Sequence, residues 1–306
     1  MYHRPVLLEE TVEMLQPLPG RTILDGTLGG GGHSEALLEA GARVIGLDQD
    51  PEALESASAR LACFGDNFQA VHANFAEADG VLDRLGMDGV DGVLLDLGVS
   101  SHQLDEPTRG FSFMRNGPLD MRMNPLARLS AADVVNTASA EELARIFFEL
   151  GEESAGRRIA ARIVKDRVAR PFRETFDLVQ SVEAVSPRRG RTHPATKVFQ
   201  ALRIHVNREL EVLEAALETF SRRLNPGGRF AIITFHSLED RMVKRFFRKH
   251  SAETIDSPEW PAPKPNPVRW FRQITSKPVI ASEQEQKDNP RSRSAKLRVV
   301  ERIHAQ

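Results

Sequence analysis

Short apolar runs alternate with amphipathic stretches over the first hundred residues of the chain. The apolar runs have the length of buried strands, and the stretches between them have the 3.6-residue period of helices. Gly41 marks a helix end, and Asp50 with Pro51 marks a helix start. Repeated strand and helix units predict a parallel sheet with helices on both faces. We expect strands at 22–25, 43–48, 68–73 and 90–96, and helices at 33–40, 51–61 and 75–85.

The alternation stops after Asp96, and only helical periodicity follows until about Asn207. Ser139 and Glu142 have the spacing of a capping box ahead of an apolar helix face. We therefore expect an all-helical insertion at 105–205 in a Rossmann-like α/β domain made of 1–104 and 206–306. Within the resumed domain we expect a helix at 207–224, a strand at 229–235, a basic helix at 238–250, an irregular loop at 258–267, and an antiparallel pair at 269–275 and 296–303.

Composition narrows the classes of protein that fit. The single cysteine, Cys63, excludes an intrachain disulfide and a thiolate zinc cluster, and the scattered histidines give no reason to expect a metal. The amino-terminal residues lack a signal-peptide pattern, and no apolar run reaches membrane-spanning length. We expect a soluble cytoplasmic protein. The oligomeric state stays open, and a homodimer is one expectation.

Charge is distributed unevenly along a chain whose formal net charge is −2. Residues 105–205 contain 17 Lys and Arg against 13 Asp and Glu, a net charge of +4, whereas the remainder contains 24 against 30. A basic insertion in an acidic frame suits a polyanionic substrate, although a solvated helix surface accounts for the surplus equally well.

A glycine-rich turn after the first expected strand, DGTLGGGGH at 25–33, suggests a nucleotide site. The acid before the glycines, Asp25, indicates which class of nucleotide cofactor the turn can bind. A pyrophosphate beside this carboxylate would be repelled, whereas S-adenosylmethionine carries an ammonium and a sulfonium instead. We therefore predict S-adenosylmethionine as the cofactor.

Two further residues complete the predicted cofactor site. Asp48 ends the second expected strand, where a carboxylate can accept hydrogen bonds from both ribose hydroxyls. Phe75 follows the third strand and either packs on adenine or belongs to the core.

The segment after the fourth strand, DLGVSS at 96–101, should face the reacting methyl group, because ligands of doubly wound sheets bind at the carboxyl ends of the strands. Methylation at a pyrimidine carbon would need a thiolate, and Cys63 lies far in sequence from every strand end. We therefore favour methylation of an exocyclic amine, with Asp96 as the catalytic proton acceptor and Ser100 and Ser101 as substrate contacts.

Several longer strings are more specific than the glycine turn. Together with 25–33 and LLDLGVSS at 94–101, they resemble the ribosomal RNA small-subunit methyltransferase H family from His3 to Ser294. The strings are GFSFM at 110–114, GPLDMRM at 117–123, HPATKVFQALR at 193–203 and FHSLEDR at 235–241.

This resemblance implies a class I methyltransferase that modifies the N4 amine of one cytidine in the decoding region (P site) of 16S ribosomal RNA, within the small ribosomal subunit. It also implies that the helical insertion recognises the substrate. His236 fits either a substrate contact or a structural hydrogen bond. The resemblance places cofactor contacts at Gly31, Gly32, His33, Asp48, Phe75, Asp96 and Gln103.

Two other functions stay open on the sequence alone. A nicotinamide-dependent dehydrogenase would share the glycine turn, but it would need glycines compatible with a pyrophosphate. A non-catalytic ribosome assembly factor that binds S-adenosylmethionine would share the basic insertion.

Overall fold

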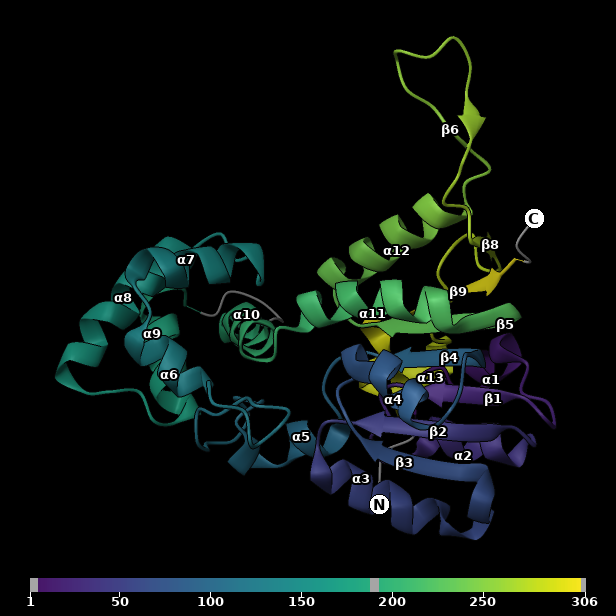
Figure 1. The fold of residues 1–306 in the computed structure, drawn as a ribbon. Coiled ribbons are helices and arrows are strands. Elements are labelled where there is room, and N and C mark those ends of the chain that lie inside the picture. Colours follow the sequence, from purple (N-terminus) through teal and green to yellow (C-terminus); the bar gives the residue numbers. More distant parts are fainter. Residues whose placement is uncertain (1–4, 188–192, 304–306) are drawn as a thin grey trace. The chain divides into compact units, whose positions relative to one another are not determined.

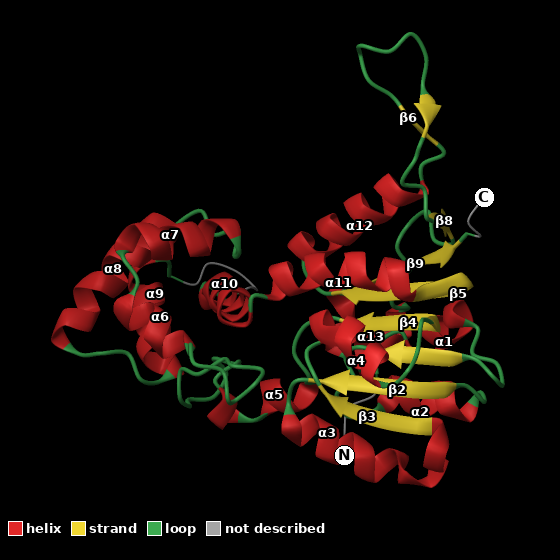
Figure 2. Ribbon diagram, in the orientation of Figure 1, coloured by secondary structure: helices red, strands yellow, loops and turns green. Residues whose placement is uncertain are grey.

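The computed structural model describes residues 5–187 and 193–303. The chain forms two compact units, Met1–Gly98 with Glu211–Gln306, and Val99–Leu210. We call them the sheet unit and the helical unit (Figures 1 and 2). The insertion limits expected from the sequence, 105 and 205, lie inside the helical unit.

A seven-stranded mixed sheet forms the centre of the sheet unit, with the strand order β3-β2-β1-β4-β5-β9-β8. The first five strands in this order run parallel, and β9 pairs antiparallel with both β5 and β8. The strand order reverses between β1 and β4, which is where doubly wound sheets bind ligands. The strands are β1 Thr22–Asp25, β2 Arg43–Asp48, β3 Phe68–His72, β4 Val90–Asp96, β5 Leu224–Thr234, β8 Phe271–Gln273 and β9 Lys296–Arg302.

Helices cover both faces of this sheet, as the alternation of strands and helices predicted (Figure 2). Successive strand residues point to opposite faces, so Leu24 packs into one apolar core and Ile23 into the other. One face is covered by α4 Ala78–Arg84, α11 Glu209–Arg223 and α12 Ser237–Ser251, and the other by α1 Leu8–Leu15, α2 Gly32–Glu39 and α3 Pro51–Leu61. The remaining helix of this unit is α13 Glu283–Asp288.

The helical unit has its own apolar core, to which Phe147, Ile159 and Leu202 contribute fully buried side chains. Between 99 and 187 and between 193 and 210 no extended strand forms, and only an isolated bridge joins Pro118 and Glu174. Its helices are α5 Ser101–Asp105, α6 Ala131–Thr137, α7 Ala140–Glu149, α8 Gly156–Ala169, α9 Thr175–Val185 and α10 Ala195–Asn207.

The expected elements are confirmed, with three differences. The helix expected at 207–224 begins at Glu209, because Arg208 adopts a left-handed conformation (φ 52°) that ends α10. The fifth strand starts earlier than expected, at Leu224, which pairs with Val90 before an irregularity in register. The proline-rich loop contains a small antiparallel pair, β6 Thr254–Ile255 with β7 Lys264–Pro265. No helix in the described ranges is long and apolar enough to cross a membrane.

Candidate active site

The carboxyl ends of four neighbouring strands bring the predicted site residues of the sheet unit to one edge. Asp48, Asp25 and Asp96 end β2, β1 and β4, and β5 ends two residues before His236. The register pairs Asp25 with Gly46 and Leu94, and Asp96 with Ile233. Parallel pairing therefore gathers these acids from distant parts of the sequence.

Asp25 is buried and already holds the glycine turn together. One carboxylate oxygen accepts a hydrogen bond from the backbone of Thr27 (3.1 Å), and the other accepts one from the Ser34 hydroxyl (2.7 Å). Burial raises the pKa of Asp25 to about 6, because desolvation disfavours the charged form. Asp25 is therefore mostly ionised at neutral pH, and removal of its charge would relieve an energetic cost.

Asp48 anchors the same turn from the next strand. Its Oδ2 atom accepts a hydrogen bond from the backbone of Gly29 (2.8 Å), and its Oδ1 atom accepts one from the backbone of Asp50 (2.9 Å). The cap of α3 falls to Asp50, as expected, because its side chain accepts from the backbone of Glu52. A carboxylate has about four acceptor positions, so Asp48 retains capacity for hydroxyl donors. Its contact with a ribose stays a prediction.

The two predicted glycine contacts lie where the turn enters α2. Gly31 has φ +76°, and a Cβ atom there would lie 3.0 Å from Leu61. A Cβ atom on Gly32 would clash with the ring of Pro5. Packing and backbone conformation therefore require both glycines, and their contact with a cofactor stays a prediction.

His33 is a buried imidazole whose hydrogen bond fixes its tautomer. Its Nε2 atom lies 3.0 Å from the carbonyl oxygen of Val6, which can only accept, so Nε2 carries the proton. Burial lowers the pKa of His33 to about 4, so the ring is neutral at pH 7. Its unprotonated Nδ1 atom lies 3.7 Å from Oδ2 of Asp96.

Asp96, the predicted catalytic residue, has an unusual environment. Its backbone N–H donates to the Thr27 hydroxyl (2.6 Å), but its buried Oδ1 atom has no hydrogen-bond partner within the described ranges. Burial, and then the negative charges of Asp25 and Glu239, raise the pKa of Asp96 well above its usual value. The side chain retains 24% of its exposure. Asp96 is therefore a reachable carboxyl group with a high proton affinity and an unused acceptor atom.

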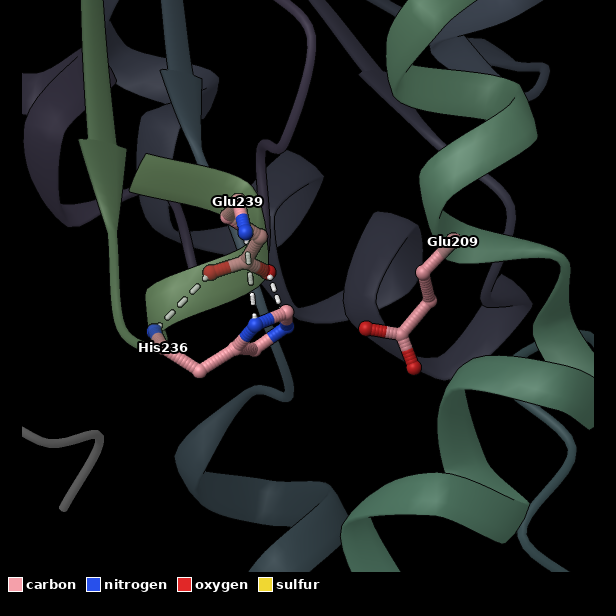
Figure 3. A group of neighbouring side chains, drawn as sticks. All are labelled: Glu209, His236 and Glu239. Carbon is pink, nitrogen blue, oxygen red and sulfur yellow. Dashed lines mark hydrogen bonds and ion pairs between the residues drawn. The ribbon is translucent and has the colours of Figure 1, made fainter. Parts of the chain in front are cut away.

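His236 and Glu239 form a tightly bonded pair at the start of α12 (Figure 3). The Glu239 carboxylate accepts hydrogen bonds from the backbones of Phe235 (2.8 Å) and His236 (3.2 Å). Its other oxygen lies 3.0 Å from Nε2 of His236 without hydrogen-bond geometry, whereas Nδ1 of His236 accepts a hydrogen bond from the backbone of Glu239 (3.4 Å). The structural alternative for His236 is thus realised, and a substrate contact stays a prediction. Glu209, also drawn there, pairs with Arg203 in the helical unit.

Glu239 and Thr27 were not singled out from the sequence. Glu239 stands three residues after His236, a spacing that indicates a helix cap and gives no sign of burial. The electrostatic effect of Glu239 on Asp96 arises from the pairing of β4 with β5, and no local pattern carries that information.

Phe75 lies in a short 3₁₀ turn after β3 and is half-buried against the apolar core of the sheet unit. Its Cβ atom lies 3.1 Å from the position that a side chain on Gly26 would occupy. Contact with the strand-end turn is compatible with both of the roles expected for Phe75.

Ser100 and Gln103 lie in the helical unit and cap α5 reciprocally. The Ser100 hydroxyl accepts from the backbone of Gln103 (3.2 Å), and the Gln103 side chain accepts from the backbone of Ser100 (3.0 Å). The side chain of Ser101, and residues His3 and Arg4, lie outside the described part of the structure. The substrate and cofactor roles of Ser100, Ser101 and Gln103 stay predictions.

The acidic edge of the sheet unit fits a cationic methyl donor. The charge of Asp25 raises the proton affinity of Asp96, and the neutral His33 supplies no positive charge beside Asp96. A ligand with an ammonium and a sulfonium would relieve this repulsion, whereas a pyrophosphate would increase it. The Oδ1 atom of Asp96, to which no described residue donates a hydrogen bond, is a further acceptor at this edge.

Comparison with known proteins agrees with this chemistry. The model of the MraW methylase family matches residues 1–303. A Geobacter sulfurreducens protein named ribosomal RNA small subunit methyltransferase H is 51% identical over 307 residues, covering 98% of this chain and 99% of that protein. Proteins of the same name from Carboxydothermus hydrogenoformans and an Anaeromyxobacter species are 51% and 52% identical over 304 residues, covering 98% of both chains in each case.

The predicted α/β methyltransferase with a Rossmann-like sheet is thereby confirmed, together with its cofactor, S-adenosylmethionine. The dehydrogenase alternative is excluded. With the family model covering nearly every residue and relatives about half identical over the full length, the chain belongs to the MraW methylase family.

Proposed function

We propose that the protein methylates the exocyclic N4 amine of a cytidine in the decoding region (P site) of 16S ribosomal RNA, within the small ribosomal subunit. The names of relatives about half identical to the chain support ribosomal RNA of the small subunit as the substrate. The chemistry of Asp96 supports an amine as the acceptor group. The single observation that carries the proposal is the buried Oδ1 atom of Asp96, which lies at the reversal point of the sheet and has no hydrogen-bond partner among residues 5–187 and 193–303.

Asp96 suits an amine because such a substrate has hydrogens to donate and a proton to lose. A carboxylate oxygen accepts a hydrogen bond from the exocyclic amine and orients its lone pair toward the electrophilic carbon. As the new nitrogen–carbon bond forms and the sulfur–carbon bond breaks, the nitrogen becomes more acidic and releases one proton. A carboxylate with a raised pKa takes up that proton more readily than an ordinary aspartate does.

The residues proposed to hold the cofactor are those of the glycine turn and its neighbouring strand ends. S-adenosylmethionine supplies an electrophilic methyl group on a sulfonium. Asp25 fixes the turn, Asp48 offers acceptor capacity to hydroxyl groups, and Phe75 offers a half-buried ring. Asp25 and Asp96 contribute negative charge that favours a cationic ligand. The remaining proposed contacts are Gly31, Gly32, His33 and Gln103.

We assign recognition of the RNA substrate to the inserted helical domain, with proposed limits 105–205. Its helix α8 exposes Arg157, Arg158 and Lys165, and no ion pair of these three forms within the described ranges. Cations of this kind hold phosphates in position, whereas base contacts supply sequence selectivity. Ser100, Ser101 and His236 are the proposed contacts to the substrate base.

The direct test is transfer of a radiolabelled methyl group from S-adenosylmethionine to purified small ribosomal subunits, followed by nucleoside analysis. We expect the label in N4-methylcytidine. Label on C5 of a pyrimidine, or only on protein, would refute the proposal. Cofactor binding without turnover on any ribosomal particle would instead indicate a non-catalytic assembly factor.

The catalytic assignment is tested by Asp96→Ala, with Asp88→Ala as the matched control. Asp88 is an exposed acid shortly before the other end of β4. We expect Asp96→Ala to lower the rate of methyl transfer by about 10²–10⁴-fold, the range of a lost general base, with RNA affinity nearly unchanged. Equal losses of transfer and of RNA binding would contradict the assignment.

A further inference from the structure

Among the sheet-unit helices within residues 5–98 and 209–303, only α12 has a positive formal charge. It contains five Lys and Arg residues and two acids. By the same count, the other helices of that unit in the described ranges are all negative. Their basic and acidic residues number 0 and 3 in α1, 0 and 2 in α2, 1 and 2 in α3, 1 and 2 in α4, 2 and 4 in α11, and 1 and 3 in α13.

The acids of α12 do not neutralise its exposed side. Glu239 is buried at the start of the helix. Asp240 pairs with Lys296 (3.0 Å) and Arg298 (2.7 Å) from β9, and these cations lower the pKa of Asp240. Both negative charges are therefore directed toward the sheet.

Four cations of α12 form a single exposed surface, which we call the cationic strip: Lys244, Arg245, Arg248 and Lys249. No ion pair involving these four forms within the described ranges. The opposite side of the helix carries Val243 and Phe247, which are buried in the core. The strip thus lies on the face of α12 that points away from the sheet unit's core, in the helix labelled α12 in Figure 1.

The arrangement opposes helix stability. Lys244 with Arg248, and Arg245 with Lys249, are like-charged pairs at i,i+4, which destabilise a helix. The helix dipole favours Arg248 and Lys249 in the last turn, but it does not favour Lys244 and Arg245 near the middle. A solvated helix face gains nothing from this pattern, whereas a surface that receives a polyanion does.

We propose that the cationic strip of α12 binds the phosphodiester backbone of the RNA substrate, outside the methyl-transfer site. This inference rests on the proposed function for the class of substrate. Phosphate contacts fix the position of a protein on an RNA without selecting a base. Because α12 begins directly after His236, RNA bound along the strip leads toward the edge of the sheet where the acids gather.

The test compares two variants of the full chain that lose the same charge. The first replaces all four strip cations by Gln (K244Q, R245Q, R248Q, K249Q). The matched control replaces four exposed cations elsewhere in the sheet unit by Gln (R43Q, R84Q, K277Q, K287Q). Binding is measured to small ribosomal subunits and to protein-free 16S ribosomal RNA between 50 and about 200 mM salt, where phosphate contacts dominate the salt dependence.

We expect the strip variant to bind both probes at least about tenfold more weakly, with a salt dependence reduced by about two to three counterions, while the control matches the wild type. The KM of the strip variant for small ribosomal subunits should rise, while its kcat and its affinity for S-adenosylmethionine stay unchanged. A fourth protein with Lys and Arg exchanged at the four positions should bind like the wild type, because charge alone is required.

Three outcomes would overturn the inference. They are equal losses in the strip variant and the control, no loss in the strip variant, or a loss confined to assembled subunits, which would indicate a ribosomal protein as the partner. Unchanged cofactor affinity excludes misfolding as the cause of weaker RNA binding. Failure of the proposed function is separately visible, because the wild type would then form no N4-methylcytidine in either probe.

Discussion

The unprotonated Nδ1 atom of His33 faces Oδ2 of Asp96 at 3.7 Å. Because the Val6 carbonyl fixes the proton of His33 on Nε2, the contact presents a lone pair to the carboxyl group and supplies no positive charge. The two residues therefore do not form an ion pair at neutral pH. Asp96 keeps its high proton affinity, which a charged imidazole would have removed.

The pH dependence of methyl transfer should follow the ionisation of Asp96. An acceptor must be ionised, so the rate should rise with pH through the raised pKa of Asp96. Glu239→Gln removes a negative charge that raises this pKa, so we expect the midpoint of the acid limb to move to lower pH. Profiles of kcat/KM measure this, with Glu214→Gln on α11 as the control. A midpoint that stays in place, or moves to higher pH, contradicts the role of Asp96.

Asp25→Asn should stabilise the protein in alkaline buffer. The folded carboxyl group holds its proton up to pH about 6, and its usual pKa is 3.8, so folding loses stability as pH rises through this window. Asn can retain bonds to Thr27 and Ser34 without the charge. We expect a gain of up to about 3 kcal/mol in unfolding free energy at pH 8, absent at pH 4, together with weaker S-adenosylmethionine binding. Denaturant titrations at both pH values measure the unfolding free energy, and calorimetry measures the affinity for S-adenosylmethionine. Equal stability of variant and wild type at pH 8 would count against the burial argument.

His33 should make the protein sensitive to acid. The unfolded imidazole takes up a proton below its usual pKa of 6.5, whereas the folded ring resists protonation until pH about 4, so stability falls as pH drops through this interval. Gln at this position can still donate to Val6 but does not titrate. When the pH falls from 7 to 4.5, the free energy of unfolding should decrease by about 2–3 kcal/mol less in His33→Gln than in the wild type. Acid titrations of both proteins, followed by circular dichroism, measure this difference. Identical unfolding curves for the wild type and His33→Gln would contradict the prediction.

Gly31→Ala should destabilise the glycine turn by about 1–3 kcal/mol. The new Cβ atom meets both an unfavourable φ of +76° and Leu61 at 3.0 Å. Gly65→Ala separates the two effects, because Gly65 also has a positive φ (+53°) but no atom within 4 Å of the Cβ position. Thermal unfolding should show the larger loss for Gly31. Equal losses would mean that contact with Leu61 contributes nothing.

Local patterns predicted the strands of the sheet and, in the sheet unit, the helices α2, α3, α4, α11 and α12. β1, β2, β4 and α3 have the expected limits, because apolar runs and the Asp50–Pro51 start signal act within a few residues. The break at Arg208 was not visible, because an arginine in the left-handed conformation has no sequence signature. The pairing within the proline-rich loop was missed because prolines indicate irregular backbone.

The site was predictable in its residue types but not in its electrostatics. The acids at the ends of β1, β2 and β4 follow from strand positions alone. The neutral state of His33 depends on its burial, and the raised pKa of Asp96 depends on burial and also on the charges of Asp25 and Glu239, the latter 143 positions later in the numbering. Such effects are set by tertiary packing, so they require the folded structure.

The sheet order also has a consequence for synthesis on the ribosome. β4 pairs with β5 in the sheet, but the ribosome must synthesise residues 97–223 after β4 before β5 begins. At about 5–20 residues per second, β4 remains an open edge of the nascent sheet for roughly 6–25 s. The helical unit can fold during that delay, because its core is formed by consecutive residues. The order of translation thus leaves closure of the sheet, and with it the placement of His236 and Glu239 beside β4, to the last third of the chain.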